Sequence, residues 1–504
     1  MAGMVGRNVD KGTWFDRVDD RVGDGLEWLM RRHHARRLRR LGWDDVLGET
    51  GDAEDGTGPD SDTWWSVHAE VRTGNRLEVL VDGSCALPAM AAAIRGAREF
   101  VHVAGWHASP DFIMHRDEGQ DGGEVVLRDL LAEVAERVPV RLLLWAEPPL
   151  PVFQPTRSQV TAVRDEFMRD SQVQCFLDGR GRTMHCHHEK LVIVDGTVAF
   201  VGGIDLTALQ GDRYDAPDHP PTEPLGWHDA AVRLSGPAVA DVARHFNQRW
   251  SEVAGERLAP PVVPAAAGDT QVQVVRTVPE RTYGFSSRGD FSILDAYLRS
   301  VRGAQRFIYL ENQFLWSPEV VDILADKLEN PPCEDFRILL LLPSRPNDGK
   351  ETTRGQLGRL VEADAGGQRL LATTLTAHDG VRDAQVYVHA KVGIVDDRWL
   401  TIGSANLNEH SLCNDTEMNV LTCDAELART TRLQLWSEHI QRPVEELDKD
   451  PCAVIDEVWR STAGEQDRRV REGLPRTHRL STLSHMSRRT DRLEGPLRGL
   501  LVDG

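Results

Sequence analysis

The chain has 504 residues, of which 40% are hydrophobic and 27% are charged. This composition excludes collagen-like, wholly disordered and disulfide-scaffold proteins, and the length fits two large domains or about three of average size. Lys and Arg number 59 and Asp and Glu 79, a net charge of −20. That charge argues against a general nucleic-acid binder, because neutralising phosphates needs a basic surface.

The predicted elements alternate between strands and helices along the chain. Short apolar runs predict strands at 77–81, 100–104, 140–145, 191–194 and 198–201. Apolar residues at helical spacing predict helices at about 87–97 and 239–250. Asp195-Gly196, between the last two strands, is a hairpin turn signal. We therefore predict an α/β fold in which helices flank a mixed β-sheet.

The sequence repeats itself with an offset of 201 residues. The segment HEKLVIVDGTVAFVGGIDL (188–206) aligns without a gap with HAKVGIVDDRWLTIGSANL (389–407). RGAREFVHVAGW (95–106) also matches RGAQRFIYLENQ (302–313), at the slightly larger offset of 207 residues. The chain is therefore two homologous halves rather than a solenoid of small repeats.

Composition places the domain boundaries. An acidic, glycine-rich stretch at 49–62 predicts a loop, and APPVVPAAAG at 259–268 predicts a linker between the halves. The predicted units are an N-terminal segment (1–62) with a basic helix and the acidic loop, a first half (63–258), the linker (259–268), a second half (269–450) and a C-terminal tail (451–504). We expect the Arg-rich middle of the tail to lie on the surface as a strap.

Several features point to a cytoplasmic protein. Seven cysteines without CxxC spacing argue against a disulfide framework and a structural zinc site. We find no signal-peptide pattern and no stretch near the ~18 apolar residues of a transmembrane helix. The basic stretch RRHHARRLRRL (31–41) is either a solvated helix face or a helix that binds anionic lipid and brings the protein to the inner membrane surface.

Each half carries one copy of the pattern H-x-K-x-x-x-x-D, followed by G-[GS]-x-[DN]. The two copies are His188, Lys190, Asp195 and His389, Lys391, Asp396. Two copies in register are not an accident of composition. Residues i and i+2 of a strand face the same way, so each His and Lys should project together. Packing of the halves about a pseudo-two-fold axis would bring all four side chains into one shared site.

The residue types suit phosphodiester chemistry. Two ammonium groups and the Asn406 amide match the dispersed charge of a phosphate. One imidazole can attack phosphorus while the other protonates the leaving alkoxide. A carboxylate commonly orients such a histidine through Nδ1, and Asp229 and Glu417 are the candidates, one in each half. We expect Asp195 and Asp396, which lie beyond a strand, to be structural.

These motifs resemble the phospholipase D superfamily, which is defined by paired HKD motifs, over about residues 75–440. The segments most similar to its eukaryotic and plant-like branch are GDRYD (211–215), WHD (227–229), IYLENQF (308–314) and GSANLNEHSLCNDTEMN (403–419). The resemblance implies a phosphohistidine intermediate, with His188 as nucleophile and His389 as acid. The remaining motif and supporting side chains are expected to be Asp195, Asp396, Asp205, Ser404, Gly203 and Gln313.

The implied activity is that of a phospholipase D, which hydrolyses the distal phosphodiester of glycerophospholipids to phosphatidate and headgroup or transfers phosphatidyl to an alcohol. A cardiolipin synthase-like phosphatidyltransferase is the alternative. An HKD nuclease fits the charge less well, and a catalytically dead scaffold is disfavoured by the intact motifs. The expected partners are a phospholipid at a membrane surface and a water or alcohol acceptor, without nucleic acid. We expect a monomer containing an intramolecular pseudo-dimer.

We predict no cofactor and no metal in the reaction, because the lysine pair supplies the positive charge that metal-dependent phosphodiesterases take from their ions. The run His185-Cys186-His187-His188 looks like a metal-binding cluster. Consecutive strand residues face opposite ways, however, and no second ligand group is near in the sequence. The sequence therefore predicts no metal site here.

Overall fold

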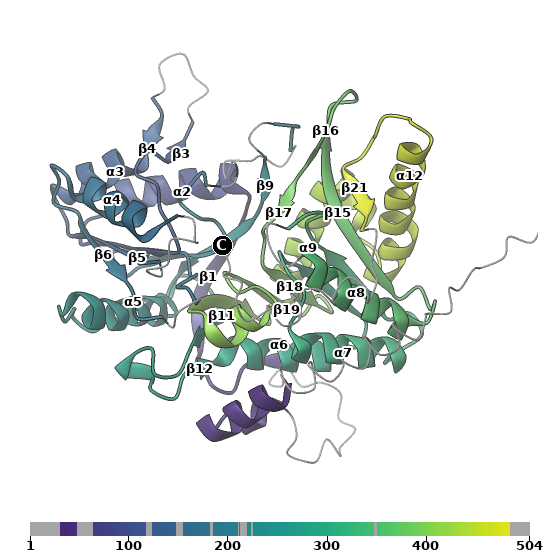
Figure 1. Cartoon of the computed structure of the whole chain (residues 1–504), viewed down its shortest axis with the longest axis horizontal. Coiled ribbons are helices and arrows are strands. Elements are labelled where there is room, and N and C mark those ends of the chain that lie inside the picture. Colours follow the sequence, from purple (N-terminus) through teal and green to yellow (C-terminus); the bar gives the residue numbers. More distant parts are fainter. Residues whose placement is uncertain are drawn as a thin grey trace, which may run out of the picture.

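The structure is a computed structural model that describes residues 31–47, 64–116, 123–147, 155–181, 185–209, 211, 219–222, 225–346 and 350–483. Within these residues, the two halves lie side by side, the first in purple to teal and the second in green to yellow (Figure 1). Strands β1 (Val71–Val81) and β11 (Thr270–Val278) pair antiparallel between them. The two halves thereby share one continuous sheet.

The first half contributes the order β6-β5-β2-β7-β8-β10-β1, in which β2, β5 and β6 are parallel. The remaining strands of this half are β2 (Val101–Gly105), β5 (Val140–Trp145), β6 (Gln174–Asp178), β7 (Leu191–Val194), β8 (Val198–Gly202) and β10 (Ala230–Ser235). The predicted strands at 77–81, 100–104, 140–145, 191–194 and 198–201 correspond to β1, β2, β5, β7 and β8. Largely apolar runs such as VRLLLW in β5 form strands that helices cover on both faces.

The second half repeats this order as β11-β20-β19-β18-β13-β14-β15 and adds β21 at its edge. Its strands are β13 (Phe307–Glu311), β14 (Arg337–Leu341), β15 (Leu370–His378), β18 (Val392–Val395), β19 (Trp399–Gly403), β20 (Glu417–Thr422) and β21 (Leu480–Thr482). Each of these strands except β21 has its counterpart in the first half, in the same order away from the β1–β11 pair. The predicted fold of two homologous α/β halves related by a pseudo-two-fold axis is confirmed.

The short strands lie outside this shared order. They are β3 (Ile113–His115), β4 (Val125–Val126), β9 (Trp227–His228), β12 (Asp290–Phe291), β16 (Asp383–Gln385) and β17 (Tyr387–Val388). Strand β9 of the first half pairs in parallel with β17 of the second, and both lie between the halves in Figure 1. This small cross-half pairing sits directly before the second HKD motif.

The helices follow the same repeat. Those of the first half are α2 (Gly83–Arg95), α3 (Leu127–Ala135), α4 (Arg157–Met168) and α5 (Val239–Ala254), and those of the second are α6 (Ser292–Gly303), α7 (Pro318–Glu329), α8 (Lys350–Asp364) and α9 (Ala425–Ile440). Helices α2 and α3 bury their apolar stripes in a core belonging to the first half. Helices α5 and α9 bury theirs, with Trp250 and Trp436, in a cluster drawn from both halves. That shared core holds the halves together.

The basic stretch 31–41 forms a helix that docks on the second half. Its Leu38 is buried, and His34 lies with Nδ1 2.9 Å from Glu319 Oε1 and Nε2 2.8 Å from Glu409 Oε1. Burial opposes the charged ring, but the two carboxylates outweigh it and raise the pKa of His34 to about 10. The inner face of this helix therefore has protein partners, which the sequence pattern did not indicate.

Residues 451–483 are integrated into the second half, and Arg468 and Arg471 of the Arg-rich stretch lie exposed at its surface. Helices α11 (Pro451–Val454) and α12 (Arg460–Arg471) flank a π-helical turn (Ile455–Trp459), and β21 pairs with β15. The Trp459 side chain is fully buried in the shared core. The described elements are completed by helix α10 (Val444–Leu447), a second π-helical turn (His410–Asn414) and two 3-10 turns, Asp44–Leu47 and Gly284–Ser286. No helix in these described ranges combines the length and the apolar character needed to cross a bilayer.

Candidate active site

Backbone pairing between the halves builds the site. The amides of His188 and Glu189 both donate to the Thr416 carbonyl, at 2.9 and 3.1 Å. In the symmetric position, the amides of His389 and Ala390 both donate to the His228 carbonyl, at 2.8 and 3.1 Å. The backbone of each HKD motif is thus bonded to the other half, at the residue directly before a candidate carboxylate. Thr416 precedes Glu417, and His228 precedes Asp229.

The first histidine is held by Glu417. His188 Nδ1 lies 3.0 Å from Glu417 Oε1, and both side chains are buried. The Glu417 carboxylate also accepts hydrogen bonds from the hydroxyls of Ser411, at 2.5 Å, and Ser404. Burial raises the pKa of Glu417, while the nearby His188 and Lys190 act in the opposite direction. The ring is therefore fixed through Nδ1, with Nε2 as the other ring nitrogen.

The second histidine is held by Asp229. His389 Nδ1 lies 2.7 Å from Asp229 Oδ2, and the ring packs against Trp227 with centroids 4.4 Å apart. Asp229 Oδ1 accepts a hydrogen bond from the Ala230 amide at 2.8 Å. Burial raises the pKa of the Asp229 carboxyl to about 6, although the Lys391 ammonium favours its charged form. The two candidate carboxylates each serve the histidine of the opposite half.

The two lysines occupy different surroundings. Lys190 Nζ forms an ion pair with Asp205 at 3.3 Å, and Lys391 Nζ lies 3.4 Å from the amide oxygen of Gln313. The Asn406 amide nitrogen donates to the same Gln313 oxygen at 3.4 Å. Burial lowers the pKa of Lys391 to about 7, and Lys190 acts in the same direction through its charge. The effect of the Lys190 charge on Lys391 is what one site shared by the two ammonium groups would produce.

The motif side chains do not lie on strands, contrary to the sequence-based expectation. His188 and Lys190 precede β7, and His389 and Lys391 lie between β17 and β18. The histidines of these stretches pair through their backbone with the other half, while the Lys391 carbonyl accepts the Gly403 amide of its own half at 3.3 Å. Each lysine still bonds to the carbonyl of its own motif histidine, at 2.8 and 2.5 Å. The common direction of His and Lys therefore comes from extended backbone and cross-half pairing.

The motif aspartates have the structural surroundings expected of them. Asp195 accepts hydrogen bonds from the amides of residues 98–100, and Asp396 accepts them from the amides of residues 305–307. Both aspartates lie in hairpin turns with positive φ, 55° and 53°. They tie each turn to the start of the neighbouring strand, at the end of the sheet away from the histidines.

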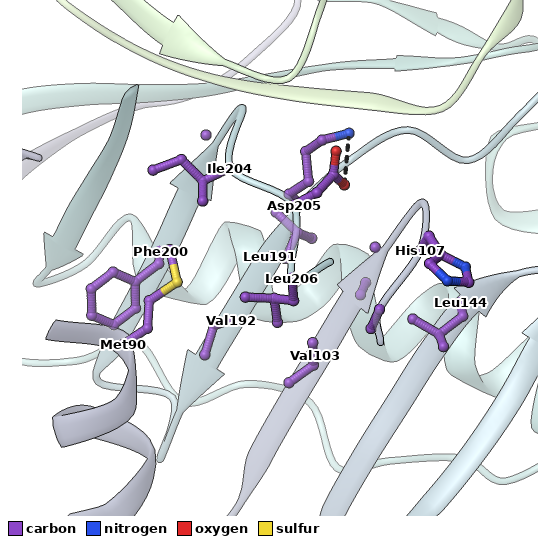
Figure 2. A pocket seen from close by; sticks show the side chains of 15 residues that line it. Met90, Val103, His107, Leu144, Leu191, Val192, Phe200, Ile204, Asp205 and Leu206 are labelled. Carbon is purple, nitrogen blue, oxygen red and sulfur yellow. Dashed lines mark ion pairs between the residues drawn. The ribbon is translucent and has the colours of Figure 1, made fainter. Parts of the chain in front are cut away.

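A small cavity lies beneath the first half-site. Figure 2 shows Asp205 at its upper end, with Phe200, Met90 and Val192 further down among core side chains. Its volume of about 20 Å³ is enough for about one water molecule. A phospholipid headgroup does not fit there, so this cavity is a gap in packing beside Lys190 and Asp205.

A buried network of histidines and carboxylates lies behind Asp229. His228 Nδ1 is 3.0 Å from Asp82 Oδ1, His228 Nε2 is 2.9 Å from Glu311 Oε2, and His219 Nε2 is 3.0 Å from Glu438 Oε1. Asp82 also accepts a hydrogen bond from the Asp229 amide at 3.0 Å. One donor atom from each of four of these residues lies within 4.8 Å of the others, and these four could hold a divalent cation: Asp82, His219, His228 and Glu438.

Sequence reasoning missed these supporting residues. Asp82 directly follows β1 and holds Asp229, while Ser411 holds Glu417. The Glu438 carboxylate lies in the segment Trp436-Ser437-Glu438, which matches Trp250-Ser251-Glu252 in the repeat. This match within the repeat is the sequence feature that could have pointed to Glu438. Of the GDRYD segment, Gly211 is described and residues 212–215 lie outside the described residues.

Comparison with known proteins agrees with this geometry. A family model described as "Phospholipase D" matches residues 93–226 and 220–320, and one described as "Cardiolipin synthase, PLD-like domain" matches residues 297–437. The chain belongs to the phospholipase D superfamily. It is 12% identical to phosphatidylserine synthase from Haemophilus influenzae Rd KW20, with a TM-score of 0.51. That alignment covers 82% of this chain and 97% of the synthase, and it supports the shared fold.

Curated relatives extend beyond the length of this chain. Phospholipase D1 of Schizosaccharomyces pombe is 25% identical over an alignment covering 80% of this chain and 39% of the relative. Phospholipase D alpha 4 of Arabidopsis thaliana is 26% identical, with 69% and 62% covered. Phospholipase D alpha 1 of the same plant is 27% identical, with 64% and 58% covered. The chain therefore spans less than two thirds of these relatives.

Proposed function

We propose that the chain is a phospholipase D that hydrolyses the distal phosphodiester of glycerophospholipids or transfers the phosphatidyl group to an alcohol. The observation that carries this proposal is the crosswise pairing of each motif histidine with a carboxylate of the other half. With Nδ1 engaged, Nε2 is the reactive nitrogen of both rings. Two such rings in one site suit a two-step displacement at phosphorus.

In the first step, His188 Nε2 attacks phosphorus and the bond from phosphorus to the headgroup oxygen breaks. His389 gives its proton to that oxygen, so the headgroup leaves as an alcohol. In the second step, neutral His389 takes a proton from water, whose oxygen attacks phosphorus and breaks the P–N bond. Phosphatidate leaves, and an alcohol in place of water gives a phosphatidylalcohol. The assignment of His188 as nucleophile rests on the family resemblance.

The remaining site residues bind and position the reacting groups. Lys190, Lys391 and Asn406 would bind the phosphate oxygens, whose negative charge is spread in the transition state. Asp229 and Glu417 fix the rings and stabilise them when protonated. Gln313 positions Lys391 and Asn406 through its amide oxygen, and Asp205 positions Lys190. We assign Ser404 and Gly203 to the surroundings of the two carboxylates.

The proposed substrate is a phospholipid at a membrane surface, and the acceptor is water or an alcohol. We propose that the protein acts as a cytoplasmic monomer, since both motifs of the site lie in one chain. The docked helix 31–41 keeps an exposed basic face, formed by Arg32, Arg36, Arg39 and Arg40. That face would favour an anionic leaflet through its charge.

A cardiolipin synthase-like transfer is the second candidate. The match of residues 297–437 to the family model with that description favours it. The same two histidines would serve, with phosphatidylglycerol supplying both the phosphatidyl group and the accepting alcohol. The two candidates differ only in the acceptor that enters the second step.

The test is to incubate the full chain with vesicles of phosphatidylcholine, phosphatidylethanolamine and phosphatidylglycerol and with a primary alcohol. A phospholipase D gives phosphatidate, free headgroup and phosphatidylalcohol. Vesicles of phosphatidylglycerol alone give cardiolipin if the second candidate is correct. The His188→Ala variant should give none of these products, whereas His33→Ala, which changes an exposed histidine outside the site, should match the wild type. Cleavage of oligonucleotides without any lipid product would contradict the proposal.

A further inference from the structure

The expectation that no second ligand group lies near His185 is wrong. The segment 186–188 pairs through its backbone with Thr416, and this pairing brings His185 to His410 and Asp415. One nitrogen or oxygen atom from each of these three residues lies within 4.8 Å of the others. His185 Nδ1 is 3.4 Å from Asp415 Oδ1, and the two imidazole rings have centroids 5.4 Å apart. Two imidazoles and one carboxylate thus meet across more than 200 residues of sequence.

The spacing suits a four-coordinate metal ion. Bonds of about 2.0–2.1 Å in a tetrahedral zinc site place neighbouring ligand atoms about 3.3 Å apart. The 3.4 Å separation of His185 Nδ1 from Asp415 Oδ1 matches that value. Rotation of the imidazole rings can bring the wider separations toward it. The donor set of two nitrogens and one oxygen favours a first-row transition metal, because calcium and magnesium prefer oxygen ligands.

A second observation points to a bound cation. Asp415 is 1% exposed, and its Oδ2 has no hydrogen-bond partner, although Oδ1 accepts the Cys186 amide at 2.8 Å. A buried carboxylate oxygen without a partner is costly, and a metal ion bound by both oxygens of the Asp415 carboxylate would satisfy it. The His185 side chain is 15% exposed, so the cluster opens to solvent on that side. An ion can enter there and keep a water ligand in the fourth position.

We propose that His185, His410 and Asp415 bind a first-row divalent transition metal such as Zn²⁺ at the edge of the active site. The bound ion links the segment before the first HKD motif to the segment that leads into Glu417. His188 and Glu417 lie three and two residues from these ligands, so the ion fixes both partners of that pair. It takes no part in the bond changes of the reaction. This site shares no ligand with the network of Asp82, His219, His228 and Glu438.

The test measures metal binding directly. The full chain is stripped with a chelator, dialysed and titrated with Zn²⁺ by calorimetry and with Co²⁺ by visible absorption, without substrate. We expect a site with the strong visible bands of low-symmetry Co²⁺. The His185→Phe variant should weaken this site by ~100-fold or more, since changes even in residues behind metal ligands cost 10–100-fold. Asp415→Asn, which keeps an oxygen for the Cys186 amide, should have a similar effect.

Two controls separate this site from other sources of binding. His33→Ala removes an exposed histidine and should leave both titrations unchanged. His219→Ala changes the network behind Asp229 and should leave the Co²⁺ bands of the proposed site in place. His185 is partly exposed, so His185→Phe should fold, and circular dichroism checks this. The proposal is overturned if the wild type binds neither metal, or if His185→Phe and Asp415→Asn bind both metals as the wild type does. The proposal is also overturned if the Co²⁺ bands disappear in His219→Ala but persist in His185→Phe and Asp415→Asn.

Discussion

The two half-sites share one backbone plan but differ in the groups around each histidine. His188 is held by Glu417, a long carboxylate supported by the hydroxyls of Ser404 and Ser411. His389 is held by Asp229, a shorter carboxylate whose Oδ1 would lie 2.2 Å from a Cβ at Gly203. The repeat places Gly203 opposite Ser404. The longer acid therefore comes with a supporting serine and the shorter acid with a glycine that makes room for it.

The residues directly before and after each motif histidine also differ between the two half-sites. In the first motif, His187 and Glu189 contact a buried ionic network that contains Asp178 and Arg249. In the second motif the corresponding residues are Val388 and Ala390, which lie in the apolar core. The lysines follow the same contrast, since Lys190 faces a carboxylate and Lys391 a neutral amide. A symmetric fold thus carries an asymmetric charge distribution, as an attacking base and a protonating acid require.

Removal of either histidine should have the largest effect. We expect His188→Ala and His389→Ala each to lower kcat/KM for phospholipid by ~10⁴-fold or more, because nucleophile and acid act as a unit. A lipid analogue with a nitrophenol leaving group separates the two, since that leaving group needs no protonation. His389→Ala should then release nitrophenol in the first step, whereas His188→Ala should not. A phosphoryl adduct trapped on His389 would reverse the assignment of roles.

Replacement of the two lysines should affect catalysis similarly but folding stability differently. Lys190→Met and Lys391→Met should each lower kcat by ~10²–10³-fold, because each removes charge that stabilises the transition state. Lys190→Met also leaves Asp205 buried without its cation, so it should lower the free energy of unfolding by about 3–5 kcal/mol. The double change Lys190→Met with Asp205→Asn should recover stability but not activity. Equal destabilisation by both single variants in chemical denaturation would contradict the contrast between the lysines.

The supporting residues should show a smaller contrast. Gly203→Ala places a methyl group against Asp229 and should move it away from His389, which we expect to lower kcat by ~10²-fold. Ser404→Ala removes one of two hydroxyls on Glu417 and should cost ~10-fold or less, since Ser411 remains. Steady-state kinetics with thermal unfolding as the folding check distinguishes these outcomes. A larger loss in Ser404→Ala than in Gly203→Ala would contradict this ranking.

Local sequence patterns predicted the strands and named the candidate residues of the site. The apolar runs of β5, β7 and β8 identified buried strands, and the 201-residue repeat predicted two equivalent halves. The crosswise pairing was not predictable, because it depends on backbone bonds between His188 and Thr416 and between His389 and His228. Spacing within one motif carries no information about a partner some 200 residues away.

Docking of the N-terminal helix escaped prediction for a similar reason. The pattern of residues 31–41 is that of a basic helix, and its partners Glu319 and Glu409 lie 285 and 375 residues from His34. From its composition alone, such a helix is expected to expose its basic side chains to water or lipid headgroups. His410 and Asp415 are equally remote from His185 in sequence, which is why a metal-binding cluster was rejected there.

The smallest expected effects concern the pH dependence of kcat/KM, which reports the different surroundings of the two half-sites. The raised pKa of Asp229, about 6, means that kcat/KM falls as the pH drops below 6, because protonated Asp229 no longer stabilises charged His389. The lowered pKa of Lys391, about 7, means that kcat/KM falls again as Lys391 loses its proton above pH 7. Lys391→Arg should move the alkaline limb to higher pH even if its maximum is lower, since arginine stays protonated. An unchanged alkaline limb in this variant would assign that limb to another group and leave Lys391 as a permanent charge.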